Sequence, residues 1–327
     1  MRAVLCKEFG PPEKLVVEEL PSPAIGKGEA RIEVHAASVN FPDLLIIQNK
    51  YQFKPPLPFS PGGEVAGVVR EVGPGVTAVK PGDRVLATTM WGGFAEEVVV
   101  GEDHVAPIPD GMDFVTASAF LMAYGTSHHA LVDRAQLKPG ETLCVLGAAG
   151  GVGLAAVEIG KVLGARVIAC ASADEKLEVC KEHGADAVVN YAREDLKERI
   201  KELTGGKGAD VVYDPVGGPF SEAALRSTAW EGRFLVVGFA GGEIPRIPLN
   251  LVLLKGCQVV GVFWGSFIAR EPERNRQSLA ELTRWFEEKK IRPHVSETFP
   301  LERAKDALNA MAERRVKGKV VLVTGRS

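Results

Sequence analysis

A chain of 327 residues is long enough to form two domains, and its 46% hydrophobic and 25% charged residues are typical of a soluble globular protein. The net charge of −3, with no block of lysines and arginines, argues against nucleic acid as an obligatory partner. Charges interrupt the N-terminus too early for a secretory signal, and no apolar run reaches membrane-spanning length. We therefore expect a cytoplasmic protein with no membrane partner.

The first third of the sequence indicates a β-rich domain. Alternating or apolar runs, separated by glycine and proline, predict strands at 31–36, 64–72, 84–88 and 95–100. Short strands with this punctuation favour a compact, barrel-like β domain.

From about Asp113, longer helices alternate with apolar strands. Helices are predicted at 152–163, 175–183, 196–203, 276–289 and 301–308, and strands at 143–146, 166–170, 187–189, 210–214, 234–238 and 258–262. This alternation implies a parallel, doubly wound sheet. A final strand at 319–323 has no obvious partner in its own segment, and we expect it to return to the N-terminal β domain.

A glycine-rich run, Gly147–Gly153, lies between an apolar strand and an alanine-rich helix. In that context bare backbone can approach a pyrophosphate, and the N–H groups and dipole of the helix point at its charge. Glycine also marks ordinary turns, so it is the strand before the run and the helix after it that make the pattern informative. The sequence therefore predicts a dinucleotide-binding site.

The next strand indicates which dinucleotide binds. NAD-selective sites place an acidic residue at the end of that strand, whereas this chain has Ala171, Ser172 and Ala173. A serine hydroxyl, with Lys176 one helical turn later, would attract the 2′-phosphate of NADPH. In an alternative interpretation, Ser172 caps the following helix and Glu175 completes a capping box. Both roles are compatible, and we predict NADPH.

Several motifs together resemble the medium-chain dehydrogenase/reductase superfamily, and within it the zinc-free NADPH:quinone oxidoreductase branch. The residues that carry this resemblance are Ser38–Asp43, Pro61–Val69, Lys80–Val85, Gly92–Glu96, Gly147–Gly153, Asn190–Tyr191 and Gly318–Leu322. The resemblance covers the whole chain. It implies an α/β protein with a GroES-like β-barrel catalytic domain (1–118 and 292–327) and a Rossmann domain with a doubly wound parallel sheet that binds NADPH (119–291).

The departures from the zinc enzymes of that superfamily concern the metal ligands. Zinc alcohol dehydrogenases have a ligand cysteine about where Ser38–Asn40 stands, and Gly-His-Glu where this chain has Gly62-Gly63-Glu64. The lobe that binds structural zinc in those enzymes is also missing. The adjacent His128 and His129 would point about 100° apart on a helix, so we expect surface or capping roles for them. Zinc needs three or four protein ligands, and we predict no metal site.

The resemblance also assigns the cofactor residues. Ala149, Gly150, Gly151 and Val152 would face the pyrophosphate, and Ser172, Lys176 and Tyr191 would surround the 2′-phosphate. Gly238, Phe239 and Ala240 follow a strand at its carboxyl end, Phe263 and Trp264 would approach the nicotinamide, and Thr126 would donate to the cofactor. The alternatives are core packing for Tyr191, Phe263 and Trp264, and a helix-surface role for Thr126.

Asn40 and Tyr51 are the candidate catalytic residues. The Asn40 amide would orient the nicotinamide or a substrate carbonyl, and Tyr51 offers a hydroxyl and an aromatic face to a flat ring. Asn40 also lies among turn-forming residues, which leaves a structural role open. We interpret Asp43 and Glu64 as buried structural carboxylates. The family often has glycine where this chain has Asn49, and this difference is expected to change how far the loop of residues 49–61 extends and hence which acceptor is preferred.

Without a metal to polarise an alcohol, hydride transfer from NADPH suits an electron-poor acceptor. We predict an NADPH-dependent quinone oxidoreductase. A reductase of alkenals, enones or enoyl thioesters on the same scaffold remains an alternative, as does a catalytically idle NADPH-binding protein. Residues 258–262 are predicted as an exposed edge strand that can extend the sheet across two subunits, and this, together with the family resemblance, predicts a homodimer.

Overall fold

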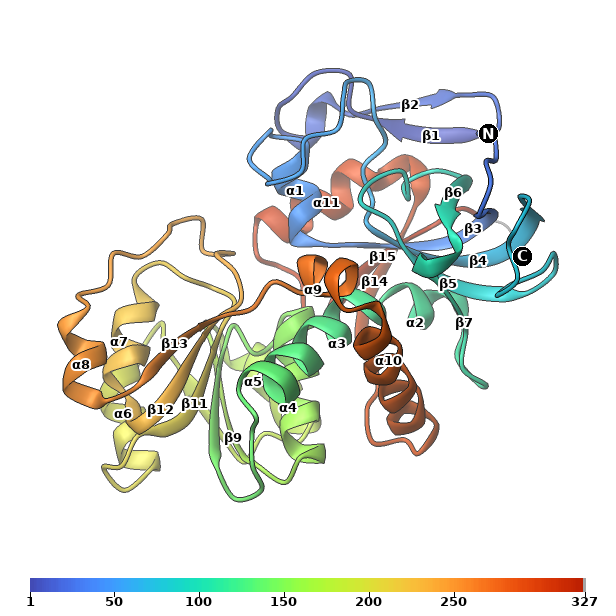
Figure 1. Ribbon diagram of the computed structural model, residues 1–327. Coiled ribbons are helices and arrows are strands. Elements are labelled where there is room, and N and C mark those ends of the chain that lie inside the picture. Colours follow the sequence, from blue (N-terminus) through green and yellow to red (C-terminus); the bar gives the residue numbers. More distant parts are fainter. Residues whose placement is uncertain (326–327) are drawn as a thin grey trace. The chain divides into compact units, whose positions relative to one another are not determined.

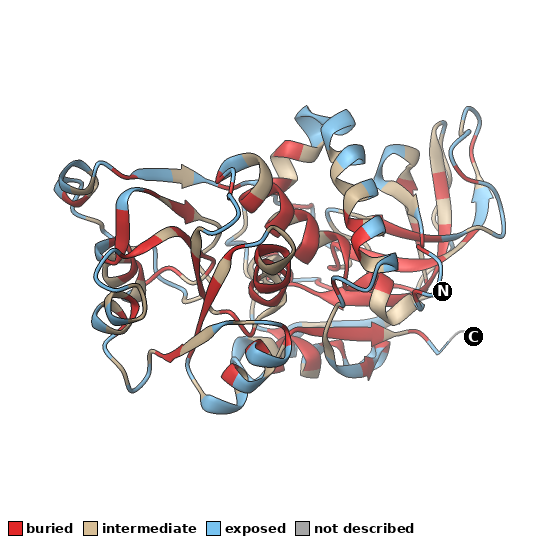
Figure 2. Ribbon diagram, turned by 90° about the horizontal axis from the view of Figure 1, so that it is seen from below, coloured by how far each residue is buried: buried red, intermediate tan, exposed pale blue. Residues whose placement is uncertain are grey.

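The computed structural model describes residues 1–325 and is shown in Figure 1. These residues form two compact units. Unit 1 comprises Met1–Met122 together with the segment from Pro293 onward, and unit 2 comprises Ala123–Arg292. Figure 2 shows that buried residues are concentrated in the strands of the sheets, while exposed residues lie on the outer faces of the helices and on the loops.

Unit 1 is built on a seven-stranded sheet, as the glycine- and proline-punctuated strands predict. Its order is β14-β15-β3-β4-β5-β7, and β6 also pairs with β3. The strands are β3 (Glu29–Val39), β4 (Glu64–Val72), β5 (Arg84–Thr88), β6 (Glu97–Gly101), β7 (Val105–Pro107), β14 (Val295–Pro300) and β15 (Lys319–Val323). A separate hairpin pairs β1 (Arg2–Leu5) with β2 (Val16–Glu19).

The return of the C-terminal strand to the N-terminal domain is confirmed. β15 is antiparallel to β3, with Val321 opposite Ser38, and parallel to β14. The short helices of this unit are α1 (Phe41–Ile46), α2 (Phe114–Ser118) and α11 (Ala304–Ala312), with 3-10 turns η1 (Pro12–Lys14), η2 (Glu102–His104) and η4 (Leu301–Arg303). The helix predicted at 301–308 thus begins as a 3-10 turn and continues to Ala312.

Unit 2 is a six-stranded, wholly parallel sheet, which confirms the predicted doubly wound architecture. Its order is β10-β9-β8-β11-β12-β13. The strands are β8 (Thr142–Leu146), β9 (Arg166–Ala171), β10 (Ala187–Asn190), β11 (Ala209–Asp214), β12 (Thr228–Val236) and β13 (Gln258–Gly261). The order reverses between β8 and β11. The carboxyl ends of these two strands therefore mark the switch point, where ligands of open α/β sheets bind.

Helices cover both faces of this parallel sheet (Figure 1). They are α3 (Leu121–His128, which begins in unit 1), α4 (Gly151–Val162), α5 (Asp174–Glu182), α6 (Leu196–Leu203), α7 (Phe220–Arg226), α8 (Asn250–Lys255), α9 (Trp264–Arg270) and α10 (Pro272–Glu287), and a π-helical turn η3 (His129–Arg134) follows α3. α6, α7 and α8 share one core with the strands, including Leu146, Ile200 and Phe234.

Candidate functional site

The turn after β8 has the geometry of a dinucleotide cradle. Gly147 adopts a left-handed conformation with φ +56°, and the N–H of Gly150 bonds the Gly147 carbonyl at 3.0 Å. Gly150 is the N-cap of α4, and no side chain caps this helix. Its first N–H groups thus have no side-chain acceptor, while the helix dipole favours an anion there. Ala149 is buried beneath the turn, and Gly150, Gly151 and Val152 are half-buried.

Gly153 lets the helix approach the turn. A Cβ at this position would lie 2.4 Å from the Gly147 carbonyl oxygen and 2.7 Å from Cα of Ala148. These are backbone atoms, so no side-chain movement could relieve the clash. Close packing of helix on strand is the role of the third glycine in dinucleotide-binding turns.

The residues assigned to the 2′-phosphate lie at neighbouring strand ends. Ser172 is exposed directly after β9, Lys176 is in the first turn of α5, and Tyr191 follows β10. The backbone N–H of Tyr191 bonds the Ala171 carbonyl at 3.1 Å, which joins the two strand ends. The Tyr191 ring also packs on Phe220, with centroids 4.3 Å apart.

The alternative role of Ser172 as a helix cap is wrong. The N-cap of α5 is Ala173, and no side chain makes the capping hydrogen bond. Ser172 lies one residue before that N-cap, and its exposed hydroxyl has no hydrogen-bond partner among the described residues. A donor without an intramolecular role is available for a ligand.

The remaining cofactor candidates follow β12 and β13 or lie on α3. Gly238, Phe239 and Ala240 are half-buried after β12. Phe263 is 47% exposed, whereas Trp264 is buried. A Cβ on Gly125 would lie 2.7 Å from the Trp264 ring, so the indole packs directly on the backbone of α3. Thr126, the next residue, is half-buried.

Asp214 was not identified from the sequence and organises the loop after β11. Its carboxylate accepts the N–H groups of Val216 and Gly217, both at 2.9 Å, and the hydroxyl of Ser221 at 2.6 Å. Its carbonyl accepts the N–H of Gly238 at 3.3 Å. An acidic residue at the carboxyl end of a largely apolar strand is the sequence signal that could have indicated this role.

Asn40 belongs to a buried polar cluster in unit 1. It is the N-cap of α1, and its Nδ2 donates to the Ser38 hydroxyl at 3.1 Å and to Glu64 at 3.3 Å. Lys319 donates to Oδ1 of Asn40 and, at 3.3 Å, to Oε2 of Glu64. Asn40 is thus buried in a hydrogen-bonded cluster, in which the Glu64 carboxylate contacts Nδ2 and the Lys319 ammonium contacts Oδ1. Lys319, a lysine opening an apolar strand, was not singled out from the sequence.

Asp43 is buried behind this cluster, as we expected for a structural carboxylate. Oδ2 accepts the backbone N–H of Asn40 at 2.7 Å, and Oδ1 accepts that of Gly62 at 3.1 Å. Burial raises the pKa of the carboxyl to about 7, against the opposing effect of these hydrogen bonds. Tyr51 packs on the core of unit 1, and burial together with the charge of Asp43 raises its pKa.

Replacing Asp43 with asparagine is expected to change how stability depends on pH. In the folded wild type the carboxyl holds its proton up to about pH 7, but in the unfolded chain it ionises near 3.8. Folding therefore takes up a proton in this window, and wild-type stability falls as pH rises. Asp43→Asn lacks that loss, so relative to wild type its free energy of unfolding should increase by about 2–3 kcal/mol between pH 5 and 7.

Chemical denaturation of both proteins at a series of pH values measures this difference. Asp103→Asn, at an exposed position on η2, is the matched control and should show a constant difference from wild type. A constant difference for Asp43→Asn as well would mean that the Asp43 carboxyl is ionised in the folded state throughout.

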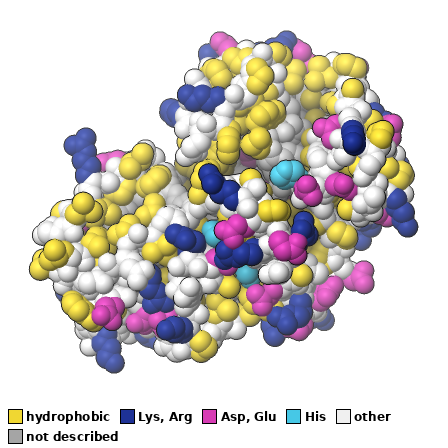
Figure 3. Space-filling model, in the orientation of Figure 1, with side chains coloured by type: hydrophobic (Ala, Val, Ile, Leu, Met, Phe, Trp, Pro, Cys, Tyr) yellow, Lys and Arg dark blue, Asp and Glu magenta, His cyan; other side chains and the backbone are white. Residues whose placement is uncertain are grey.

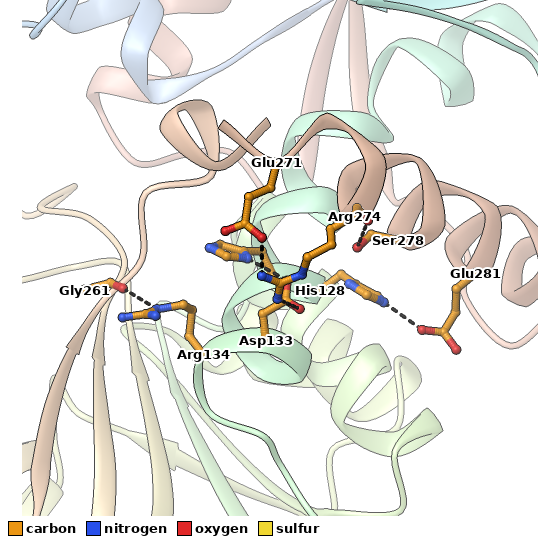
Figure 4. A network of polar contacts seen from close by, with 9 residues as sticks. His128, Asp133, Arg134, Gly261, Glu271, Arg274, Ser278 and Glu281 are labelled. Carbon is orange, nitrogen blue, oxygen red and sulfur yellow. Dashed lines mark hydrogen bonds and ion pairs between the residues drawn. The ribbon is translucent and has the colours of Figure 1, made fainter. Parts of the chain in front are cut away.

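The predicted surface or capping roles of His128 and His129 are wrong. Both are buried, and each pairs with a carboxylate; Figure 4 shows the pair formed by His128 and Glu281. His128 Nε2 lies 2.9 Å from Glu281, and His129 Nδ1 lies 2.7 Å from Asp133, which also binds Arg274 at 2.7 Å. The π-helical turn, η3, directly follows His128 in the chain. The two imidazoles thus contact separate carboxylates, Glu281 and Asp133.

Within residues 1–325, no group of three or more histidine, cysteine or acidic side chains is arranged to hold a metal ion. None of the helices in this part of the chain is long and apolar enough to cross a membrane.

Comparison with known proteins shows what this chain is similar to. Residues 26–110 match the alcohol dehydrogenase GroES-like domain, and residues 151–286 match the zinc-binding dehydrogenase family. A quinone oxidoreductase-like protein 2 homolog of Nematostella vectensis is 42% identical, over 99% of this chain and 89% of that protein.

Two solved structures extend the comparison. A mycobacterial protein complexed with NADPH aligns with a TM-score of 0.93 and 33% identity, over 99% of this chain and 100% of that one. Escherichia coli quinone oxidoreductase complexed with NADPH aligns with a TM-score of 0.92 and 30% identity, over the same shares. Because these similarities span both units, the chain belongs to the medium-chain dehydrogenase/reductase superfamily, in the branch of the quinone oxidoreductases.

Proposed function

We propose that this protein is a zinc-independent NADPH:quinone oxidoreductase. The observation that carries the cofactor assignment is the end of β9, where an exposed serine stands in place of a carboxylate. An acidic side chain there would repel a 2′-phosphate, whereas a hydroxyl beside Lys176 attracts it. The acceptor is inferred from the relatives, which are named as quinone oxidoreductases.

NADPH supplies the hydride when bound, and the protein binds and orients the reactants. The uncapped start of α4 holds the pyrophosphate, and Ser172, Lys176 and Tyr191 select the 2′-phosphate. Phe263, exposed after β13, offers an aromatic face at the nicotinamide end. Asn40 and Tyr51 of unit 1 orient the reacting groups, and holding them at a fixed position lowers the barrier.

The donor set around Asn40 supports the proposed zinc independence. The segment Ser38–Asn40, about where the zinc enzymes have a ligand cysteine, contains no thiol, and Gly63 stands where they have histidine. The Lys319 ammonium already donates to Asn40 and to Glu64, so a second cation would meet repulsion there. Metal analysis of the purified protein tests this, and stoichiometric zinc would contradict it.

Steady-state assays with NADPH against benzoquinone, naphthoquinone, an enal and an enoyl thioester test the activity. Quinones are expected to give the highest kcat/KM. Faster turnover of the enal or the thioester would instead identify an alkene reductase. NADPH oxidation no faster than background with every acceptor would leave a binding protein without catalysis.

Ser172→Asp is expected to weaken NADPH binding by about tenfold or more, or roughly 1.4 kcal/mol, because the added carboxylate repels the 2′-phosphate. Affinity for NADH should change much less, since it lacks that phosphate. Titration of intrinsic fluorescence measures both. Ser22→Asp, at an exposed serine of unit 1, adds the same charge elsewhere and should leave binding unchanged. Equal affinity in Ser172→Asp and wild type would remove Ser172 from the site.

We also propose that the protein is a cytoplasmic homodimer that pairs through β13. This strand is the edge of the parallel sheet, with hydrogen-bonding groups open on one side. Large apolar side chains are exposed on or near it: Trp230, Leu249, Leu253, Leu254 and Val259. Figure 3 shows hydrophobic side chains at the surface around the α8 end of unit 2. Such a patch is typical of an interface.

Light scattering tests the assembly. Wild type is expected at twice the chain mass of 35.0 kDa. Leu253→Glu places a charge in a residue that is 77% exposed, and it should shift the protein to monomer without unfolding it. Leu57→Glu, at an exposed leucine of unit 1, is the matched control and should remain a dimer. A monomeric wild type would refute the proposal.

A further inference from the structure

A buried ion pair encloses the amide of Asn40. Lys319 begins β15, Glu64 begins β4, and both side chains are more than nine-tenths buried, as is Asn40 between them. The ammonium donates to Oδ1 of Asn40, and Nδ2 donates to Oε2 of Glu64 at 3.3 Å. These residues are 279 and 24 positions away from Asn40 in the chain. The sequence pattern around Asn40 therefore gives no sign of either contact.

The charges determine which way the amide faces. An ammonium can only donate hydrogen bonds and an ionised carboxylate can only accept them. Oδ1 must therefore face Lys319, and Nδ2 must face Glu64. The reverse orientation would place two donors together at Lys319 and two acceptors together at Glu64. Glu64 is itself held in place by the Ser38 hydroxyl at 2.6 Å and the Met122 N–H at 2.9 Å.

We propose that Lys319 is a positioning residue of the reaction, which fixes the direction of the Asn40 amide together with Glu64. This inference rests on the proposed function, in which Asn40 orients the reacting groups. It adds a residue of the C-terminal strand to a site otherwise formed by the N-terminal segment of unit 1. A purely structural role, in which Lys319 only neutralises Glu64, is the competing explanation.

The single variant Lys319→Met does not separate these roles. It removes the contact with Asn40 and also leaves the Glu64 carboxylate buried without its cation, which destabilises proteins strongly. In the double variant Lys319→Met with Glu64→Gln, both substituted side chains are uncharged and similar in shape to the wild-type side chains. In it, the oxygen of the introduced glutamine can still accept the Met122 N–H, and the glutamine amino group then faces Asn40. The Asn40 amide is then no longer held in its wild-type orientation, and the reversed orientation becomes the better one.

The experiment compares wild type, the single and double variants, and the control Lys305→Met, which removes an exposed lysine from α11. Melting temperature, kcat and the KM for NADPH are measured for each. We expect the single variant to lose about 5–10 °C in Tm, and the double variant to recover most of that loss. Its kcat should nevertheless stay about tenfold or more below wild type, with KM for NADPH within about twofold, because only orientation in the transition state is lost.

Asn40→Ala is the reference for the effect of the amide itself. Its kcat should fall as far as that of the double variant, and combining all three substitutions should cause no further loss, because they remove one shared interaction. Recovery of both Tm and kcat in the double variant would show that Lys319 only neutralises Glu64. Wild-type activity in Asn40→Ala would overturn the positioning role too. An inactive wild type would instead contradict the proposed function.

Discussion

Gly153→Ala is expected to lower the affinity for NADPH by about a hundredfold, or roughly 2.7 kcal/mol. The added methyl would lie 2.4 Å from the Gly147 carbonyl oxygen and 2.7 Å from Cα of Ala148. Both belong to the turn that we propose as the pyrophosphate site, so α4 must move away from β8 and carry its N–H groups with it. Overpacking of this kind also costs about 1–3 kcal/mol of stability.

Fluorescence titration with NADPH measures the loss, and Gly160→Ala on the same helix is the matched control. A Cβ on Gly160 would lie 2.7 Å from Leu143 and 3.0 Å from Val167, but in both cases it meets a side chain and not the turn. The control should lose stability and keep NADPH affinity within about threefold. If Gly153→Ala bound NADPH as tightly as wild type does, the turn would not be the pyrophosphate site.

Glu158→Ala is expected to lower the free energy of unfolding by about 3–5 kcal/mol. This carboxylate lies on α4, is 4% exposed, and accepts three hydrogen bonds in unit 2. The donors are the Tyr124 hydroxyl at 2.6 Å, Nδ1 of His183 at 2.7 Å and the backbone N–H of Arg292 at 3.0 Å. Alanine would remove the carboxylate acceptor of all three donors, and the loss of each of these hydrogen bonds destabilises the folded state.

Chemical denaturation measures this loss, with Glu158→Gln and Glu175→Ala as the comparison variants. Glutamine keeps the shape and one acceptor oxygen, so its loss should be smaller, about 1–2 kcal/mol. Glu175 is exposed on the next helix, α5, and its removal should change stability by no more than about 0.5 kcal/mol. A loss of that small size for Glu158→Ala would mean that water replaces the carboxylate in the cavity.

The elements with a regular residue pattern were predictable, and those without one were not. β4, β15 and α6 have the predicted bounds, because each is a regular apolar or amphipathic run ended by glycine, threonine or a change of charge. β12 was predicted from Phe234 but begins at Thr228. The polar, partly exposed start of this strand lacks the apolar pattern. The sequence analysis did not predict the β1–β2 hairpin or α8. The strand β1 has four residues and α8 has six, and segments this short show no clear residue pattern.

The sequence by itself determined the features that depend on neighbouring residues. The strand, the glycine turn and the helix of a dinucleotide site lie within one short segment, and the missing carboxylate after β9 is visible as Ala171-Ser172. Backbone conformation at glycine and repulsion of a phosphate are local effects, so a local pattern reports them.

Only the tertiary structure decided which polar groups are buried together. Glu64 and Lys319 are 255 residues apart in the chain, and Glu158 and His183 belong to different helical segments. His128 and His129, expected at the surface, are paired and buried. A buried charge is tolerable only where folding supplies its partner, and that partner can come from any point in the chain. The orientation of Asn40 is therefore a property of the fold and not of the motif that contains it.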